Sequence, residues 1–86
     1  MKIKGLIIKN PKNWKASAYN GGFDDTGMNT TIPQDILNKL GLKSGDSVMF
    51  EFKGRRISTN VGPNGRVGLT RPEINKLGYL NDQKGK

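Results

Sequence analysis

A short segment occurs twice in this chain. Residues 38–41 read Asn-Lys-Leu-Gly, and residues 75–78 repeat the same four letters. Each copy follows a stretch that begins with glycine and contains a proline, residues 27–33 in the first copy and 65–72 in the second. Two copies of one unit in a single chain usually pack against each other about an approximate twofold axis. The repeat therefore predicts a fold of two related halves, closed either within one chain or between two chains.

The length of the chain limits how large a core it can build. Eighty-six residues make at most one domain, and such a domain is marginally stable by itself. The chain has no Cys for a disulfide and no Cys or His for a zinc or haem site of the usual kind. Association of two chains is a remaining route to stability, so a homodimer is one expectation.

Charge indicates the class of partner. Fifteen Lys and Arg face seven Asp and Glu, which gives a formal net charge of +8. A field of this sign attracts nucleic acid first, then acidic proteins and anionic membranes. Eleven of the fifteen cations are Lys, which weakens the argument for base-specific reading, where Arg leads. No segment has the roughly twenty apolar residues of a membrane span, and the N-terminal apolar run is too short for a signal peptide, so we expect a cytoplasmic protein that does not bind a membrane.

Periodicity predicts a mainly β chain with two short helices. The first helix begins at Pro33 and ends at Gly41, since proline suits a first turn and glycine a left-handed stop. The second spans residues 71–77 and stops at Gly78. Alternating or β-branched runs predict the strands, at residues 3–8, 14–19, 30–32, 48–52, 56–61 and 66–69.

These elements define one domain, residues 1–80. Its repeat halves are residues 14–53 and 55–80. The repeat unit reads strand, strand, helix, strand, and the second half lacks the last strand of this unit. The spare N-terminal strand, residues 3–9, could take that place, as in a permuted barrel; otherwise another chain fills it. Residues 81–86 contain no apolar side chain and are expected to form a flexible basic tail.

Residues 31–48 closely resemble the core motif of the AbrB/MazE-type swapped-hairpin (SpoVT-AbrB-like) DNA-binding proteins. That motif runs Gly-Arg-Val, a proline, a short helix, Leu-Gly-Leu, then Gly-Asp and a strand. This chain reads Ile-Pro at 32–33, Leu-Gly-Leu at 40–42, Gly-Asp at 45–46, and Gly-Arg-Val at 65–67 in the second copy. Duplicated in one chain, the unit also resembles the double-psi β-barrel of some AAA ATPase substrate-recognition domains. The resemblance covers residues 30–52 strongly and 65–80 weakly.

Both families belong to the cradle-loop barrel group, so the resemblance implies a small cradle-loop barrel, AbrB-like or double-psi in its connections. It also implies duplex DNA as the partner and a transcription regulator or antitoxin-like protein as the function. AbrB-type proteins carry Arg on the short helix and after the preceding glycine. The first copy has Met28, Leu37 and Asn38 at those positions, so only Arg66 of the second copy carries over as a DNA contact.

Basic residues gather in three places that could contact phosphate. Such contacts would give salt-sensitive binding with little sequence selectivity, and adjacent Arg residues on a hairpin turn could reach into a groove. A turn of this kind can equally be charged for solubility alone. The candidate nucleic-acid contacts are Lys12 and Lys15, then Lys53, Arg55 and Arg56, then Arg66 and Arg71.

Trp14, the only tryptophan, has two interpretations. Between Lys12 and Lys15 it could stack on a base or anchor a protein partner. We expect instead that it plugs one end of the barrel, because a large aromatic side chain in a small domain is more often in the core.

Catalysis and metal binding are not expected. Asp24, Asp25 and Asp46 are too few to hold a divalent ion, and no Ser has an evident general base. The sequence therefore predicts a non-enzyme without cofactor that binds duplex DNA. The open alternatives are a module that binds an acidic partner protein, as a small phage protein would, and a protein that binds RNA or single strands through Trp14, Tyr19 and the basic turns.

Overall fold

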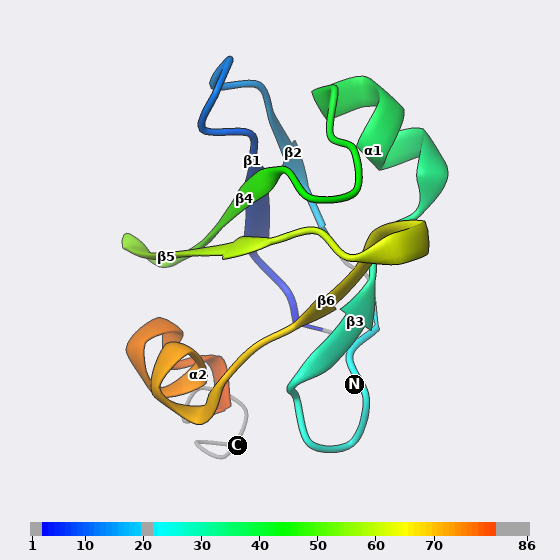
Figure 1. Cartoon of the computed structure of the whole chain (residues 1–86). Coiled ribbons are helices and arrows are strands. Elements are labelled where there is room, and N and C mark those ends of the chain that lie inside the picture. Colours follow the sequence, from blue (N-terminus) through cyan, green and yellow to red (C-terminus); the bar gives the residue numbers. More distant parts are fainter. Residues whose placement is uncertain (1–2, 20–21, 81–86) are drawn as a thin grey trace.

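The computed structural model describes residues 3–19 and 22–80 (Figure 1). The tail expected at residues 81–86 lies outside the described residues. The chain forms, in order, β1 (Leu6–Lys9), β2 (Ala16–Ala18), β3 (Asn29–Thr31), α1 (Gln34–Leu40), β4 (Ser47–Phe52), β5 (Arg55–Asn60), the 3₁₀ turn η1 (Pro63–Gly65), β6 (Arg66–Gly68) and α2 (Arg71–Leu77).

The strands form two antiparallel sheets. The larger has the order β2-β1-β4-β5, and the smaller is a two-stranded ribbon of β3 and β6. Alternation along β4 sends Val48, Phe50 and Phe52 into the core, while the residues between them lie on the outer face. The structure thus confirms a small, mainly β fold with two short helices.

The β3–β6 ribbon joins the two copies of the repeat symmetrically. Asn38 and Asn75 are 37 positions apart, and the same offset separates Thr30 from Val67. Thr30 and Val67 are register partners in the ribbon, and α1 and α2 begin and end 37 positions apart. An antiparallel pair of equivalent residues has a local twofold axis between them. The two copies are therefore related by a local dyad at the Thr30–Val67 pair.

Two backbone hydrogen bonds flank this pair and repeat the symmetry. The Ile32 N–H donates to the carbonyl of Gly65 at 2.9 Å, and the Leu69 N–H donates to the carbonyl of Met28 at 2.7 Å. The twofold relation exchanges the copies, so adding 37 to the donor position converts Ile32 to Leu69, and subtracting 37 from the acceptor position converts Gly65 to Met28. Each bond fixes the point where a strand turns into its helix.

This alignment corrects the sequence-based pairing of the copies. Arg66 was matched with Met28 by aligning the glycines at positions 27 and 65, but the ribbon makes Asn29 the equivalent of Arg66. The structural reason is that Gly27 corresponds to Asn64, and both adopt the left-handed conformation, with φ of +74° and +61°. Asparagine tolerates that conformation better than most residues, so it can occupy the position where the first copy has glycine.

Both helices are set by their ends. Pro33 is the N-cap of α1, and the Gly41 and Leu42 N–H groups return to the carbonyls of Asn38 and Leu37, a Schellman closure. The start of α2 is a capping box between Thr70 and Glu73. The helix predictions, including the glycine stops, are confirmed.

The N-terminal strand pairs with β4, at the centre of the larger sheet. Leu6 faces Phe52 and Lys9 faces Met49 in the register. The strand begins at Leu6 rather than Ile3 because Gly5 has a φ of +89°, which interrupts the extended backbone. Ile3 is nonetheless buried. Because β1 pairs with β2 on its other side, each central strand of this sheet is joined to an edge strand by a short connection.

The core lies between the larger sheet, the ribbon and the helices. Figure 1 shows α1 and α2 at opposite corners of the molecule, with the ribbon between them. Phe23 contacts the rings of Tyr19, Phe50 and Tyr79, and so links the ribbon loop to the sheet. Within residues 3–19 and 22–80, no helix is long and apolar enough to cross a membrane.

We predict that Gly65→Ala destabilises the protein far more than Gly54→Ala. Both glycines have a positive φ, +81° and +83°, so both variants carry the cost of a left-handed alanine, about 1 kcal/mol. A Cβ at position 65 would also lie 2.5 Å from the Ile32 carbonyl oxygen, whereas a Cβ at position 54 meets nothing within 4 Å.

We expect an additional loss of at least about 2 kcal/mol for Gly65→Ala, because backbone must move to relieve the contact. Denaturant unfolding measures both free energies. Equal losses in the two variants would contradict the close contact at the dyad.

Candidate nucleic-acid interface

The β4–β5 turn presents the densest group of cations. Phe52 and Arg55 are the last paired residues, and the two residues between them, Lys53 and Gly54, have φ of +48° and +83°. Two consecutive positive φ values are the mark of a type I′ hairpin turn, whose twist matches that of the strands. The Lys53 ammonium lies 5.4 Å from the centre of the Phe52 ring. The turn is therefore tight and brings three cations within four positions of the chain.

Arg55 and Arg56 leave this hairpin on opposite faces of the sheet. The Arg55 guanidinium lies directly against Gly78, where an added Cβ would collide with its Nη1. Gly78 ends α2, where cations complement the helix dipole. Arg56 is opposite Glu51, whose carboxylate pairs with the ammonium of Lys9. The hydrogen bond from Lys9 lowers the pKa of Glu51, and the charges of Lys9 and Arg56 lower it further.

The β1–β2 loop carries the second basic group, Lys12 and Lys15. Two asparagines fix the loop to the end of α1, with Asn10 Nδ2 donating to the Leu40 carbonyl at 2.8 Å and Asn13 Nδ2 donating to the same oxygen at 3.2 Å. Both lysines are exposed. The loop is thus attached to the C-terminus of α1, as the β4–β5 turn is placed against the end of α2 through Arg55.

Trp14 is on the surface, so the expectation that it plugs the barrel was wrong. Its side chain is 62% exposed. Its φ of +60° turns the chain away from the strand direction, and β2 begins only at Ala16. The alternating pattern from position 14 was misleading because its first two residues, Trp14 and Lys15, belong to a hydrogen-bonded turn and precede the strand.

Tyr19 has the opposite outcome and is buried. Its hydroxyl bonds to the Thr30 hydroxyl and donates to the Thr31 carbonyl at 3.0 Å. Burial raises the pKa of Tyr19, while the Thr30 contact acts in the other direction. Tyr19 therefore joins β2 to the ribbon, and the suggestion that it contacts a single strand was wrong.

The third basic group is divided between two elements. Arg66 opens β6, where it faces Thr31 in the register, and Arg71 opens α2. Both are exposed. Figure 1 places the β1–β2 loop, the β4–β5 turn and the start of β6 at three separate points of the molecule. The structure thus exposes all seven predicted basic residues, but it does not gather them into one patch.

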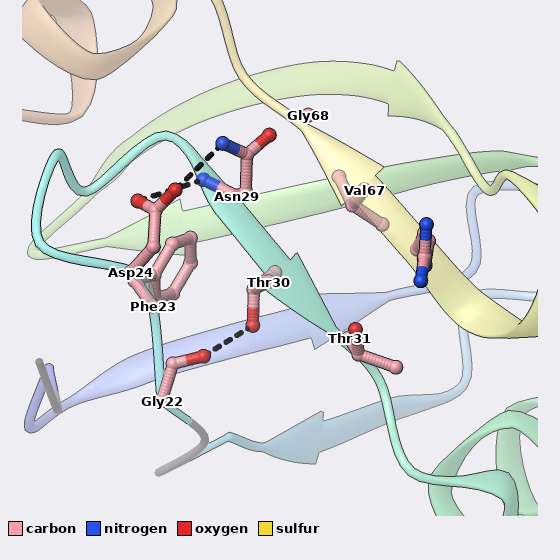
Figure 2. Close-up of a pocket in the computed structure, with 9 residues that line it drawn as sticks. Gly22, Phe23, Asp24, Asn29, Thr30, Thr31, Val67 and Gly68 are labelled. Atoms are coloured by element: carbon pink, nitrogen blue, oxygen red, sulfur yellow. Dashed lines mark hydrogen bonds between the residues drawn. The ribbon is translucent and has the colours of Figure 1, made fainter.

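A groove of about 670 Å³ runs beside the ribbon and contains Arg66 (Figure 2). Asp24 points to Asn29 there, accepting from Asn29 Nδ2 at 2.6 Å, and the Thr26 hydroxyl donates to the other carboxylate oxygen at 2.6 Å. The hydrogen bonds from Thr26 and Asn29 hold the pKa of Asp24 well below its usual range. The groove is lined by Gly22, Phe23, Asp24, Asn29, Thr30, Thr31, Arg66, Val67 and Gly68.

Asp24 is thus a structural carboxylate. It organises the loop before β3, whose Gly27 carbonyl accepts the hydroxyl of buried Tyr79. Burial, and to a lesser extent the charge of Asp24, raises the pKa of Tyr79 to about 12. In the part of the chain that the structure describes, no three His, Cys, Asp or Glu side chains come together as metal ligands.

Sequence reasoning missed the two anchoring residues Asn10 and Asn13. Their side-chain oxygens also accept from the Lys12 and Lys15 N–H groups, each at 2.9 Å. Each asparagine stands two positions before the residue whose N–H it accepts, which was a usable signal because Asn side chains commonly bond to the backbone two residues on. Their partner on α1, 27 to 30 positions away, had no signal.

Comparison with known proteins gives little further information. No family model matches the chain, and no solved structure matches it. Among curated proteins, the chain is similar to the mitochondrial glycine amidinotransferase of Gallus gallus, with 30% identity over 92 aligned residues. The match covers 96% of this chain but 22% of that protein, so the chain spans about a fifth of that relative's length.

Proposed function

We propose that this protein binds duplex DNA through its basic turns, as a transcription regulator or an antitoxin-like protein, and that its role is binding rather than catalysis. The β4–β5 hairpin is the observation that carries the proposal. Lys53, Arg55 and Arg56 are exposed on a tight turn, and nowhere else in the described residues do three exposed cations fall within four positions. The turn projects from the edge of the larger sheet, and basic residues on such a β-turn can reach into a DNA groove.

Charge at the hairpin supports the same partner. The nearest carboxylate on the outer face, Glu51, is paired with Lys9 and does not present an unpaired negative charge beside the turn. Arg66 and the β1–β2 loop lie elsewhere on the surface, where they would contact phosphates outside the hairpin's groove. Lysine and arginine contacts to phosphate add affinity with little sequence preference.

For the fold, we propose a cradle-loop barrel completed within one chain, related to the AbrB-like and double-psi barrels. The local dyad supports this, because it relates the two copies of the strand–helix unit through one shared ribbon. The place of β1 beside β4 supports it further, because the N-terminal strand then supplies what the second copy lacks.

We therefore predict a monomer, although a homodimer was the expectation for AbrB-like closure. Sedimentation equilibrium or light scattering should return the mass of one chain, 9.5 kDa, at micromolar protein. A stable dimer across a wide dilution range would contradict closure within one chain and favour an interleaved barrel.

For DNA binding, we predict that the double variant Arg55→Ala/Arg56→Ala weakens binding to duplex DNA and reduces its salt dependence. Three phosphate contacts give a slope of log affinity against log salt of about −3, and each lost contact reduces its magnitude by about 1. Fluorescence anisotropy with a labelled duplex at several salt concentrations measures both. Arg66→Ala should have a smaller effect of the same sign.

The matched control is Lys39→Ala/Lys76→Ala, which removes the same charge from exposed, dyad-equivalent positions on α1 and α2. It should retain most of the affinity. Thermal unfolding of each variant separates lost contacts from lost fold, since Arg55 also lies against the end of α2. Equal losses in the two double variants would refute duplex recognition by the hairpin. Affinity for polyglutamate equal to that for the duplex would also refute it and would favour an acidic protein partner.

A further inference from the structure

The β1–β2 loop holds a tryptophan on the surface in a strained conformation. Among the described residues, Trp14 is the only large apolar side chain that is exposed, and its φ of +60° is rare for a bulky residue. Such strain persists only where the surrounding structure fixes the backbone, and it is concentrated at functional sites. The hydrogen bonds of this loop identify what fixes it.

Backbone bonds close the turn around Trp14. The Asn10 carbonyl accepts from the N–H of Trp14 at 2.6 Å and from that of Asn13 at 3.3 Å, while the Asn10 N–H donates to the Lys15 carbonyl at 2.9 Å. Asn10 and Asn13 then attach the turn to the Leu40 carbonyl. The indole is therefore presented on a rigid support, so little backbone freedom is lost when a partner covers it.

The surroundings of the indole are cationic. Lys12 and Lys15 flank it in the sequence and are both exposed, and no acidic residue lies between positions 10 and 19. A groove of about 470 Å³ runs from Lys12 to the turn before β4. Asp46 lines its far side, where its carboxylate accepts from the Lys43 N–H at 2.9 Å. The lysines can therefore contact phosphate next to an exposed aromatic face.

We propose that this loop is a binding site for single-stranded nucleic acid, with an unpaired base stacked on Trp14 and the flanking phosphates on Lys12 and Lys15. An aromatic ring beside cations is how proteins bind single strands without reading sequence. A duplex keeps its base faces stacked inside, so it offers the indole no equivalent surface. This site is separate from the hairpin proposed for duplex DNA and does not depend on it.

The test uses the full chain and oligothymidylate of about 10 nucleotides, within the range of single-strand site sizes. Because Trp14 is the only tryptophan, its emission reports the site directly. Emission should be quenched by the oligonucleotide and remain unchanged with a long blunt duplex at equal nucleotide concentration. Equal quenching by the duplex, or by polyglutamate, would overturn the proposal, the latter in favour of an acidic protein partner.

Variants measured by anisotropy of the labelled oligonucleotide complete the test. Trp14→Gly should weaken binding at least about 5-fold, the lower end of base–aromatic stacking. It should unfold at the same temperature as the parent or higher, since glycine has no penalty at this φ. Lys12→Ala/Lys15→Ala should weaken binding and reduce its salt dependence.

Trp14→Phe, which keeps an aromatic face, should lose less affinity than Trp14→Gly. Arg55→Ala/Arg56→Ala removes the same charge as the loop variant and should leave single-strand affinity unchanged, so the two proposed sites fail independently. Unchanged affinity in Trp14→Gly would overturn the stacking site. A loss in the hairpin variant equal to that in the loop variant would show general attraction to positive charge and would overturn it as well.

Discussion

The fold depends on a pair of symmetry-related hydrogen bonds. The Ile32–Gly65 and Leu69–Met28 backbone bonds join the two copies of the repeat on either side of the Thr30–Val67 pair. They connect parts of the chain that are far apart in sequence, and each lies where a strand passes into its helix. They fix where each helix starts, while the buried faces of the helices pack on the core. Gly65 is required because a Cβ would contact the Ile32 carbonyl.

The helix ends then position the surface loops. The Leu40 carbonyl at the end of α1 receives Asn10 and Asn13, and Gly78 at the end of α2 lies under the Arg55 guanidinium. Each helix thus supports one basic turn, and the two turns lie at separate points of the molecule (Figure 1). That separation is why we propose two sites with different ligands, a hairpin for duplex DNA and a tryptophan loop for single strands, in place of one continuous basic patch.

The sequence predicted the elements that local chemistry determines. Residues 71–77 are helical as expected, because Gly78 and the proline near the start mark both ends. The repeat itself was visible, but its alignment was wrong by one residue at Arg66, because Asn64 adopts a conformation usually associated with glycine. Trp14 and Tyr19 were misjudged because their burial depends on a turn anchored to α1 and on the ribbon, and neither contact has a local signature.

The dyad ribbon is most directly tested by nuclear Overhauser effects in solution. Because residues 32 and 65 form a hydrogen-bonded pair, their neighbours Thr31 and Arg66 form a non-hydrogen-bonded pair, whose α-carbons approach to about 4.5 Å. We predict strong contacts between the α-protons of Thr31 and Arg66 and, by symmetry, of Asn29 and Gly68. A ribbon shifted by one residue, or α-proton contacts for neither pair, would contradict the twofold relation between the repeats.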